Sequence, residues 1–201
     1  MRCLLPAIVA LSLAGCATAP PTQPSNICHI FQEKSGWYDA AKSSHKRWGA
    51  PIPVSMAIIY QESGYRADAA PPRNRLLWVI PWTRVSSAYG YTQALDSTWK
   101  QYEKESGNGW ASRKNFSDSI DFVGWYIHSS YRILGLSKTD AYSQYLAYHE
   151  GQGGFRRGSY RGKPGLQRIA RRVASRATNY RRQLNGCRAK LEADSGWWPF
   201  W

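Results

Sequence analysis

Acidic residues are scarce in this sequence. Its 201 residues include 13 Asp and Glu against 27 Lys and Arg, which gives a formal net charge of +14. Residues 151–190 contain no acid, and their apolar residues recur every three or four positions between Leu166 and Leu184. This spacing predicts an amphipathic helix with a basic, solvated face. With so few carboxylates, the chain offers few candidates for acid–base chemistry.

Metal-binding and phosphate-binding motifs are also missing. The sequence has no Cys-x-x-Cys and no His-Glu-x-x-His, so we predict no metal site and no cofactor. The glycine-rich stretch 151–158 invites comparison with a phosphate-binding loop. However, only three residues separate Gly158 from Gly162-Lys163 where four are needed, and Pro164 follows in place of Ser or Thr.

The apolar run at the N-terminus, Leu4–Ala14, is too short to span a bilayer. With Arg2 before it and small residues after it, the run predicts a signal peptide over residues 1–15. Leu13-Ala14-Gly15-Cys16 resembles a bacterial lipobox, in which the cysteine is acylated. An ordinary signal peptide that happens to contain Cys16 is the alternative. Because Ala17 and not Asp follows, we expect a lipid anchor at the periplasmic face of the outer membrane.

The rest of the chain divides into three parts. Residues 16–27 are rich in Pro and predict an extended tether, residues 28–190 form one folded domain, and residues 191–201 form an aromatic tail. For that tail, docking on the domain, a membrane interface and a protein partner all remain open.

Cys28 and Cys187 lie at the two ends of the domain. An oxidising compartment favours a disulfide between them, and two buried thiols are the alternative.

One carboxyl stands out against this background. Apolar residues repeat at helical spacing over residues 53–65, and Pro53 and Gly64 are suited to begin and end a helix there. Glu62 then lies in the last turn, where the helix dipole and apolar neighbours disfavour its charged form. We therefore expect a raised pKa and a proton that can be donated near neutral pH. A solvated helix-end glutamate is the alternative.

Two later segments favour the interpretation of Glu62 as a proton donor over that of a solvated glutamate. Glu62-Ser63 is followed along the chain by Gly90-Tyr91-Thr92-Gln93 and by Ala147-Tyr148-His149-Glu150-Gly151. In this order and spacing, the three segments resemble the motifs of the lysozyme-like lytic transglycosylases: Glu-Ser closing a helix, Gly-x-x-Gln, and Ala-Tyr-Asn-x-Gly. The resemblance covers roughly residues 45–185 and implies a mainly α, lysozyme-like single domain. Within it, the Pro-rich residues 66–88 predict a small irregular or β-containing segment.

The resemblance implies a role for each matching residue. Glu62 would be the catalytic acid and then base. Ser63 would orient Glu62 or touch a sugar, Gln93 would bind the substrate through its amide, and Tyr148 would hydrogen-bond near Glu62. Tyr91, inside the second motif, is also a predicted substrate contact. A structural polar contact is the alternative for Ser63, Gln93 and Tyr148.

The third motif departs from the family pattern, because His149 and Glu150 replace Asn-x. Glu150 is either a second active-site carboxylate, counted here among the substrate-binding residues, or a structural ion pair with a nearby Arg. We expect no bond between His149 and Glu150 themselves, since adjacent residues on a helix point apart.

The resemblance implies non-hydrolytic cleavage of peptidoglycan glycan strands between N-acetylmuramic acid and N-acetylglucosamine. A hydrolytic lysozyme and a non-catalytic wall-binding lipoprotein are the alternatives. The basic face of residues 151–190 would then attract anionic peptides of peptidoglycan or lipid phosphates, if it does more than solvate the domain. Nucleic acid is not an expected partner, because a signal peptide is present and no nucleic-acid module is recognisable.

Overall fold

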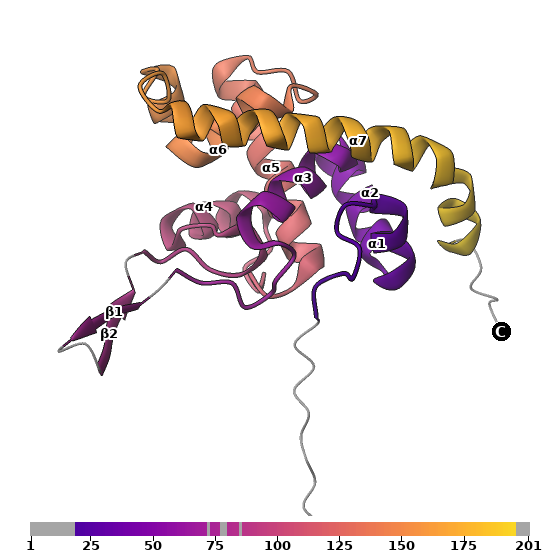
Figure 1. Cartoon of the computed structure of the whole chain (residues 1–201), viewed down its shortest axis with the longest axis horizontal. Coiled ribbons are helices and arrows are strands. Elements are labelled where there is room, and N and C mark those ends of the chain that lie inside the picture. The colour runs from indigo at the N-terminus through magenta and orange to yellow at the C-terminus, as the bar shows by residue number, and fades with distance from the viewer. Residues whose placement is uncertain (1–18, 72, 77–79, 85, 196–201) are drawn as a thin grey trace, which may run out of the picture.

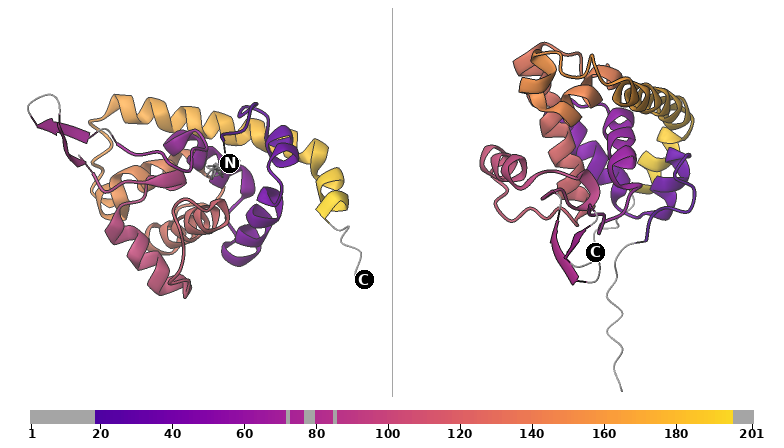
Figure 2. Two further views of the ribbon diagram at one scale, coloured as in Figure 1. Left: turned by 90° about the horizontal axis from the view of Figure 1, so that it is seen from below. Right: turned by 60° about the vertical axis from the view of Figure 1, so that its left-hand side comes forward.

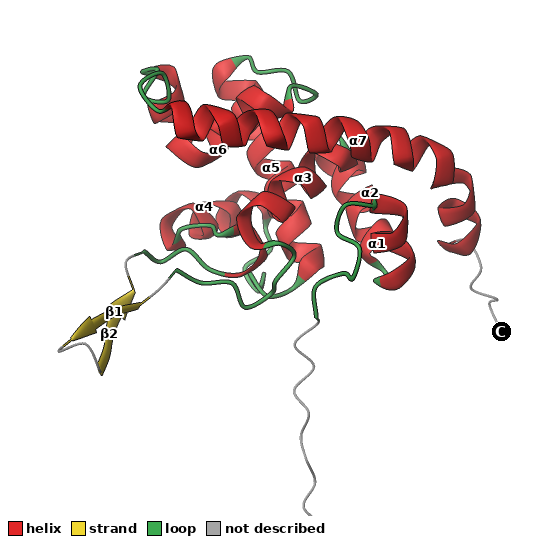
Figure 3. Cartoon of the chain, in the orientation of Figure 1, coloured by secondary structure: helices red, strands yellow, loops and turns green. Residues whose placement is uncertain are grey.

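The computed structural model describes residues 19–71, 73–76, 80–84 and 86–195 (Figures 1 and 3). The predicted signal peptide, Cys16 and residues 196–201 of the aromatic tail lie outside this range. The elements in chain order are α1 (Ile27–Glu33), α2 (Trp37–Trp48), α3 (Ile52–Ser63), β1 (Arg73–Leu76), β2 (Ile80–Arg84), the 3-10 turn η1 (Gly90–Thr92), α4 (Asp96–Ser106), α5 (Phe116–Leu134), α6 (Ala141–Arg156) and α7 (Pro164–Ser195). The predicted mainly α fold is confirmed.

Helix α3 is the buried centre of the fold. Every residue from Ile52 to Ile59 is buried, and the helix packs against α7, α5 and η1. Pro51 directly precedes the helix and Pro53 lies in its first turn, and Gly64 ends it in the left-handed conformation with φ 60°. The sequence predicted a helix between Pro53 and Gly64, as observed. Because this helix is apolar on every side, other elements of the fold cover it on every side.

Helix α7 lies across the other helices and contacts α1, α3 and α6 (Figures 1 and 2). Its apolar stripe from Leu166 to Leu184 is buried, as predicted. The stripe continues to Leu191, which is 5% exposed, and the helix runs on to Ser195. The predicted start of the tail at residue 191 is therefore wrong, because Leu191 follows Leu184 by two helical turns and is held by the same packing.

The N-terminal segment is fixed on the domain before α1 begins. The Tyr180 hydroxyl donates to the carbonyl of Pro24, and the Gln183 amide donates to the carbonyl of Ser25 at 3.1 Å. A disulfide joins Cys28 of α1 to Cys187 of α7. The sequence-based tether of residues 16–27 is therefore too long at its C-terminal end, since these contacts with α7 replace solvent around residues 24–27.

Strands β1 and β2 form an antiparallel hairpin in which Arg73 is opposite Arg84. It extends beyond the helical body, away from the centre of the fold (Figure 2, left). This hairpin is the β-containing part expected within residues 66–88. Across the described parts of the chain, no helix is both long and apolar enough to cross a bilayer.

Candidate active site

A cavity of about 380 Å³ lies at the C-terminal end of α3. Side chains from α3, α4, α5, α6 and the η1 loop meet there. Its lining consists of Glu62, Ala88, Gln93, Ala94, Leu95, Thr98, Phe122, Tyr126, Tyr148, His149, Glu150 and Gly151. Residues from all three sequence motifs therefore share one cavity, although up to 89 positions separate them along the chain (62 to 151).

Glu62 is half-buried at the wall of this cavity. Burial raises the pKa of its carboxyl from 4.5 to about 7, and a hydrogen bond from Tyr145 acts in the opposite direction. The direction is the one expected from the sequence. The main cause is the loss of water around the carboxyl. At neutral pH the group is thus close to half protonated, which suits a carboxyl that first gives and then takes a proton.

Tyr145 is a site residue that the sequence analysis missed. It is 3% exposed on α6, one turn before Tyr148, and its hydroxyl hydrogen-bonds to Glu62. Residues three apart on a helix share a face, so the placement of Tyr148 in the site could have pointed to Tyr145 as well. Burial, followed by the Glu62 charge, raises the pKa of Tyr145, so its phenol stays protonated and can donate.

Gln93 is held rigidly at the cavity by its own loop. Its backbone is left-handed with φ 49°, and its amide nitrogen donates to the carbonyls of Ala69 and Gly90, each at 2.9 Å. Because both amide hydrogens are used by the backbone, the carbonyl Oε1 is the atom suited to receive a hydrogen bond from a substrate N–H or O–H.

Tyr148 connects the second and third motifs. Its hydroxyl donates to the carbonyl of Thr92 at 2.7 Å, and its ring meets Phe122 and Tyr126 edge to face. Burial, followed by the charge of Glu62, raises its pKa well above 10. The three rings form an aromatic wall of the cavity. Such a wall offers apolar faces to a sugar and keeps the site around Glu62 poor in water.

Glu150 lines the cavity, but its carboxylate is hydrogen-bonded to neighbouring side chains. Lys163 donates to both of its oxygens, at 2.9 and 2.8 Å, and the Ser159 hydroxyl donates to Oε2. The side chain is 5% exposed, and these bonds, led by that of Lys163, lower its pKa to about 2. The carboxylate therefore remains ionised, and its partner is a lysine where the sequence analysis considered an arginine.

The expectation that His149 and Glu150 do not bond is wrong. His149 Nδ1 lies 3.1 Å from Glu150 Oε1. Regular helical geometry in α6 stops at Gly151, whose φ and ψ are 71° and 157°. Glu150 is thus the last residue before the interruption, and Lys163 and Ser159 draw its side chain to a position that the His149 ring also reaches.

Two predicted site residues lie outside the cavity lining. Ser63 is 9% exposed, and its hydroxyl donates back to the carbonyl of Ile59 at 3.1 Å. Tyr91 is 1% exposed and packs edge to face against Trp37 and Phe116 in the core. Both residues stabilise the segments that carry Glu62 and Gln93. In the described ranges, no group of three His, Cys, Asp or Glu residues is arranged to hold a metal ion.

A mainly helical domain with one protonatable carboxyl at the end of its buried central helix, facing Gln93 and Tyr148, is of the lysozyme-like class. The chain belongs to the transglycosylase SLT domain family, whose model matches residues 4–187. This membership supports peptidoglycan lytic transglycosylase activity in general and implies that the domain binds peptidoglycan. Comparisons with curated proteins and with solved structures found no match.

Proposed function

We propose that this protein cleaves the β-1,4 bond between N-acetylmuramic acid and N-acetylglucosamine without consuming water, and leaves 1,6-anhydro-muramyl ends. The observation that carries the proposal is the position of Glu62. It is a half-buried carboxyl with a pKa of about 7, in the cavity that also holds Gln93 and Tyr148.

In the proposed reaction, the protonated Glu62 donates its proton to the glycosidic oxygen as the bond to the muramyl C1 breaks. The substrate's own N-acetyl group stabilises the resulting positive charge at C1. The carboxylate of Glu62 then removes the proton from the muramyl 6-hydroxyl, whose oxygen bonds to C1 and closes the anhydro ring. One residue serves as acid and then as base, and its proton is restored at the end.

The neighbours of Glu62 have supporting roles in this proposal. Tyr145 holds the carboxyl in one orientation through its hydrogen bond. The Oε1 of Gln93 receives a hydrogen bond from an N–H or hydroxyl of the glycan. The aromatic wall of Tyr148, Tyr126 and Phe122 limits the access of water, which would otherwise compete with the 6-hydroxyl.

The state of Glu150 favours this reaction over hydrolysis. A lysozyme needs a second carboxylate that accepts a proton from water. With a pKa of about 2 and both oxygens bonded to Lys163, Glu150 is a weak base at neutral pH. Among the described lining residues, Glu62 is then the single carboxyl that can exchange a proton near pH 7.

The test is mass spectrometry of purified peptidoglycan digested with the full chain, beside Glu62→Gln and the control Glu103→Gln. Glu103 lies on α4 outside the cavity. We expect anhydro-muropeptides from the wild type and from Glu103→Gln, and none from Glu62→Gln. Reducing ends that carry the added mass of water would instead indicate a lysozyme. Unchanged activity of Glu62→Gln would refute the role of Glu62, and no cleavage by any of the three would favour a wall-binding scaffold.

We also propose that Cys16 is acylated and anchors the protein at the periplasmic face of the outer membrane. The tetrapeptide ending in Cys16 and the Ala that follows it support this proposal. Labelling of cells with a fatty-acid analogue should mark the wild type and leave Cys16→Ala unlabelled. Equal labelling of both would contradict the anchor.

A further inference from the structure

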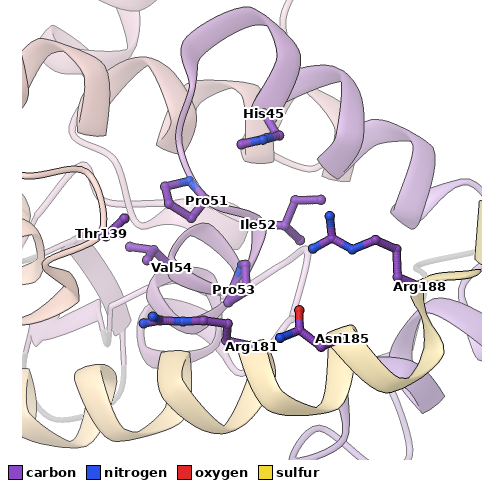
Figure 4. A pocket seen from close by; sticks show the side chains of 9 residues that line it. All are labelled: His45, Pro51, Ile52, Pro53, Val54, Thr139, Arg181, Asn185 and Arg188. Atoms are coloured by element: carbon purple, nitrogen blue, oxygen red, sulfur yellow. The ribbon is translucent and has the colours of Figure 1, made fainter.

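A second cavity, of about 270 Å³, lies at the N-terminal end of α3 (Figure 4). Glu62 lies near the other end of that helix. The cavity is open to solvent and is bounded by the end of α2, the start of α3, the α5–α6 connection and one exposed face of α7. Its lining residues are His45, Pro51, Ile52, Pro53, Val54, Thr139, Arg181, Asn185 and Arg188. At about 1.5 Å per residue, Ile52 and Glu62 lie about 15 Å apart along α3, so this cavity is separate from the candidate active site.

The two sides of the cavity differ in chemistry. Residues 51–54 give one side two proline rings and two aliphatic side chains. On the other side, Arg181, Asn185 and Arg188 follow one another at spacings of four and three along α7 and present their polar ends to the cavity (Figure 4). No Asp or Glu belongs to the described lining, so the cavity is apolar on one side and positively charged on the other.

The two arginines of this cavity are exposed and are not paired with an acid of the described chain. Neither Arg181 nor Arg188 forms a hydrogen bond or an ion pair with another described residue. The charge of Arg188 acts on the Tyr38 hydroxyl, which donates to Glu192 at 3.2 Å, one turn further along α7. In contrast, Arg182 donates to Asn179 at 2.6 Å and lies outside the cavity. The two cavity arginines thus retain their donors for an external acceptor.

We propose that this cavity binds an acidic peptide. Arg181 and Arg188 would each receive a carboxylate, Asn185 would pair with a peptide group, and residues 51–54 would contact small apolar side chains. The two arginines are seven residues apart, about 10 Å along the helix, which is about the length of three extended peptide residues. An apolar floor adds nothing to the binding of a lone phosphate, and this favours a peptide.

This inference rests on the proposed function, because the stem peptides of peptidoglycan are short, rich in alanine and acidic. It adds a second site of engagement to the enzyme. One cavity acts on the glycan through Glu62, and the other holds a peptide of the same polymer through α7. The basic face of α7 then has a local purpose at Arg181 and Arg188, beyond general attraction to an anionic wall.

The test is calorimetric titration of a free peptidoglycan tetrapeptide into the full chain carrying Glu62→Gln, at low salt. We expect Arg181→Gln and Arg188→Gln each to weaken binding about ten-fold, the usual effect of losing one charge-assisted hydrogen bond. Arg182→Gln, which removes the same charge from the same helix, should change the affinity less than about two-fold. The peptide with amidated carboxyl groups should bind at least about ten-fold more weakly than the acid form.

Three results would overturn the proposal. If Arg181→Gln and Arg182→Gln weakened peptide binding equally, the contribution of the arginines would be a diffuse attraction by the charge of α7 and not a site. If the amidated peptide bound as tightly as the acid form, the protein would not recognise the carboxylates of the peptide. Binding of vesicles with anionic phospholipid that depends on Arg181 and Arg188, without binding of the peptide, would assign the cavity to lipid phosphates. Because binding is measured on a variant designed not to cleave, its outcome is independent of whether Glu62 performs the proposed chemistry.

Discussion

The hydroxyl of Tyr145 donates a hydrogen bond to the carboxyl of Glu62, and this bond opposes the effect of burial on the proton affinity of the acid. Burial favours the neutral carboxyl, while the hydrogen bond favours the carboxylate. The balance holds the pKa of Glu62 at about 7. Burial therefore raises the pKa of Glu62, and the bond from Tyr145 limits how far it rises.

Replacing Tyr145 by Phe should shift this balance. Without the hydrogen bond, the pKa of Glu62 rises above 7, so the acid form persists to higher pH. The alkaline limb of the kcat/KM profile should move to higher pH, and the maximum rate should fall because the carboxyl loses its orientation. Tyr142→Phe, on the same helix but outside the cavity, is the matched control. An alkaline limb that stays in place, or moves to lower pH, would contradict this account.

Glu62 should also cost stability at alkaline pH. Its folded pKa of about 7 lies above the ordinary value of 4.5, so the folded state binds the proton more tightly than the unfolded state. Stability is then lost as pH rises from about 4.5 to about 7. Glu62→Gln should be more stable than the wild type by about 1–3 kcal/mol at about pH 8, and nearly equal to it at about pH 4. Urea unfolding at the two pH values measures this difference, and a variant less stable at pH 8 would refute it.

The ion pair between Lys163 and Glu150 should have the opposite pH dependence. The pKa of Glu150 is lowered to about 2 in the folded protein, below its ordinary value of 4.5. The stabilisation by the ion pair is therefore present above pH 4.5 and is lost as the pH falls towards 2. Because Lys163 is half exposed, Lys163→Met should destabilise the protein by about 1–2 kcal/mol at neutral pH. Lys190→Met on the exposed face of α7 is the control. A loss that persists at about pH 2 would exclude the Glu150 charge as its cause.

Gly90 should be the least replaceable glycine near the site. Its φ is +71°, and an added Cβ would lie 2.2 Å from the backbone oxygen of Arg113. Gly90→Ala should therefore lower the unfolding free energy by about 3 kcal/mol, from the left-handed backbone and the overlap together. It should also raise KM, since the Gly90 carbonyl holds the amide of Gln93. Gly109→Ala, which meets open space, is the control. A Gly90→Ala protein as stable as this control would show that the loop adapts.

The features predicted from the sequence are those with a strong local signal. Helix α3 is marked by Pro53, Gly64 and an unbroken apolar segment, and α7 by a stripe of apolar residues among arginines. These patterns determine which surfaces are buried, so they also place Glu62 at the end of a buried helix.

The features missed by the sequence analysis depend on contacts between distant segments. Residues 24–27 have the composition of a tether, and only Tyr180 and Gln183 of α7 reveal that they are fixed to the domain. The choice of Tyr145 as the partner of Glu62 depends on how α6 packs against α5 and α7. The ion pair of Glu150 depends on the kink at Gly151 and on the return of the later chain, which brings Lys163 next to Glu150. No local sequence pattern indicates this contact.

The central claim is that Glu62 breaks the glycosidic bond and that no water enters the product. Digestion of peptidoglycan by the full chain in water enriched with oxygen-18, followed by mass spectrometry of the muropeptides, tests it most directly. The account predicts anhydro-muramyl ends without the heavy isotope, and their absence in the Glu62→Gln digest. Reducing muramyl ends that carry oxygen-18 would contradict it, because they would show that water attacks the muramyl carbon.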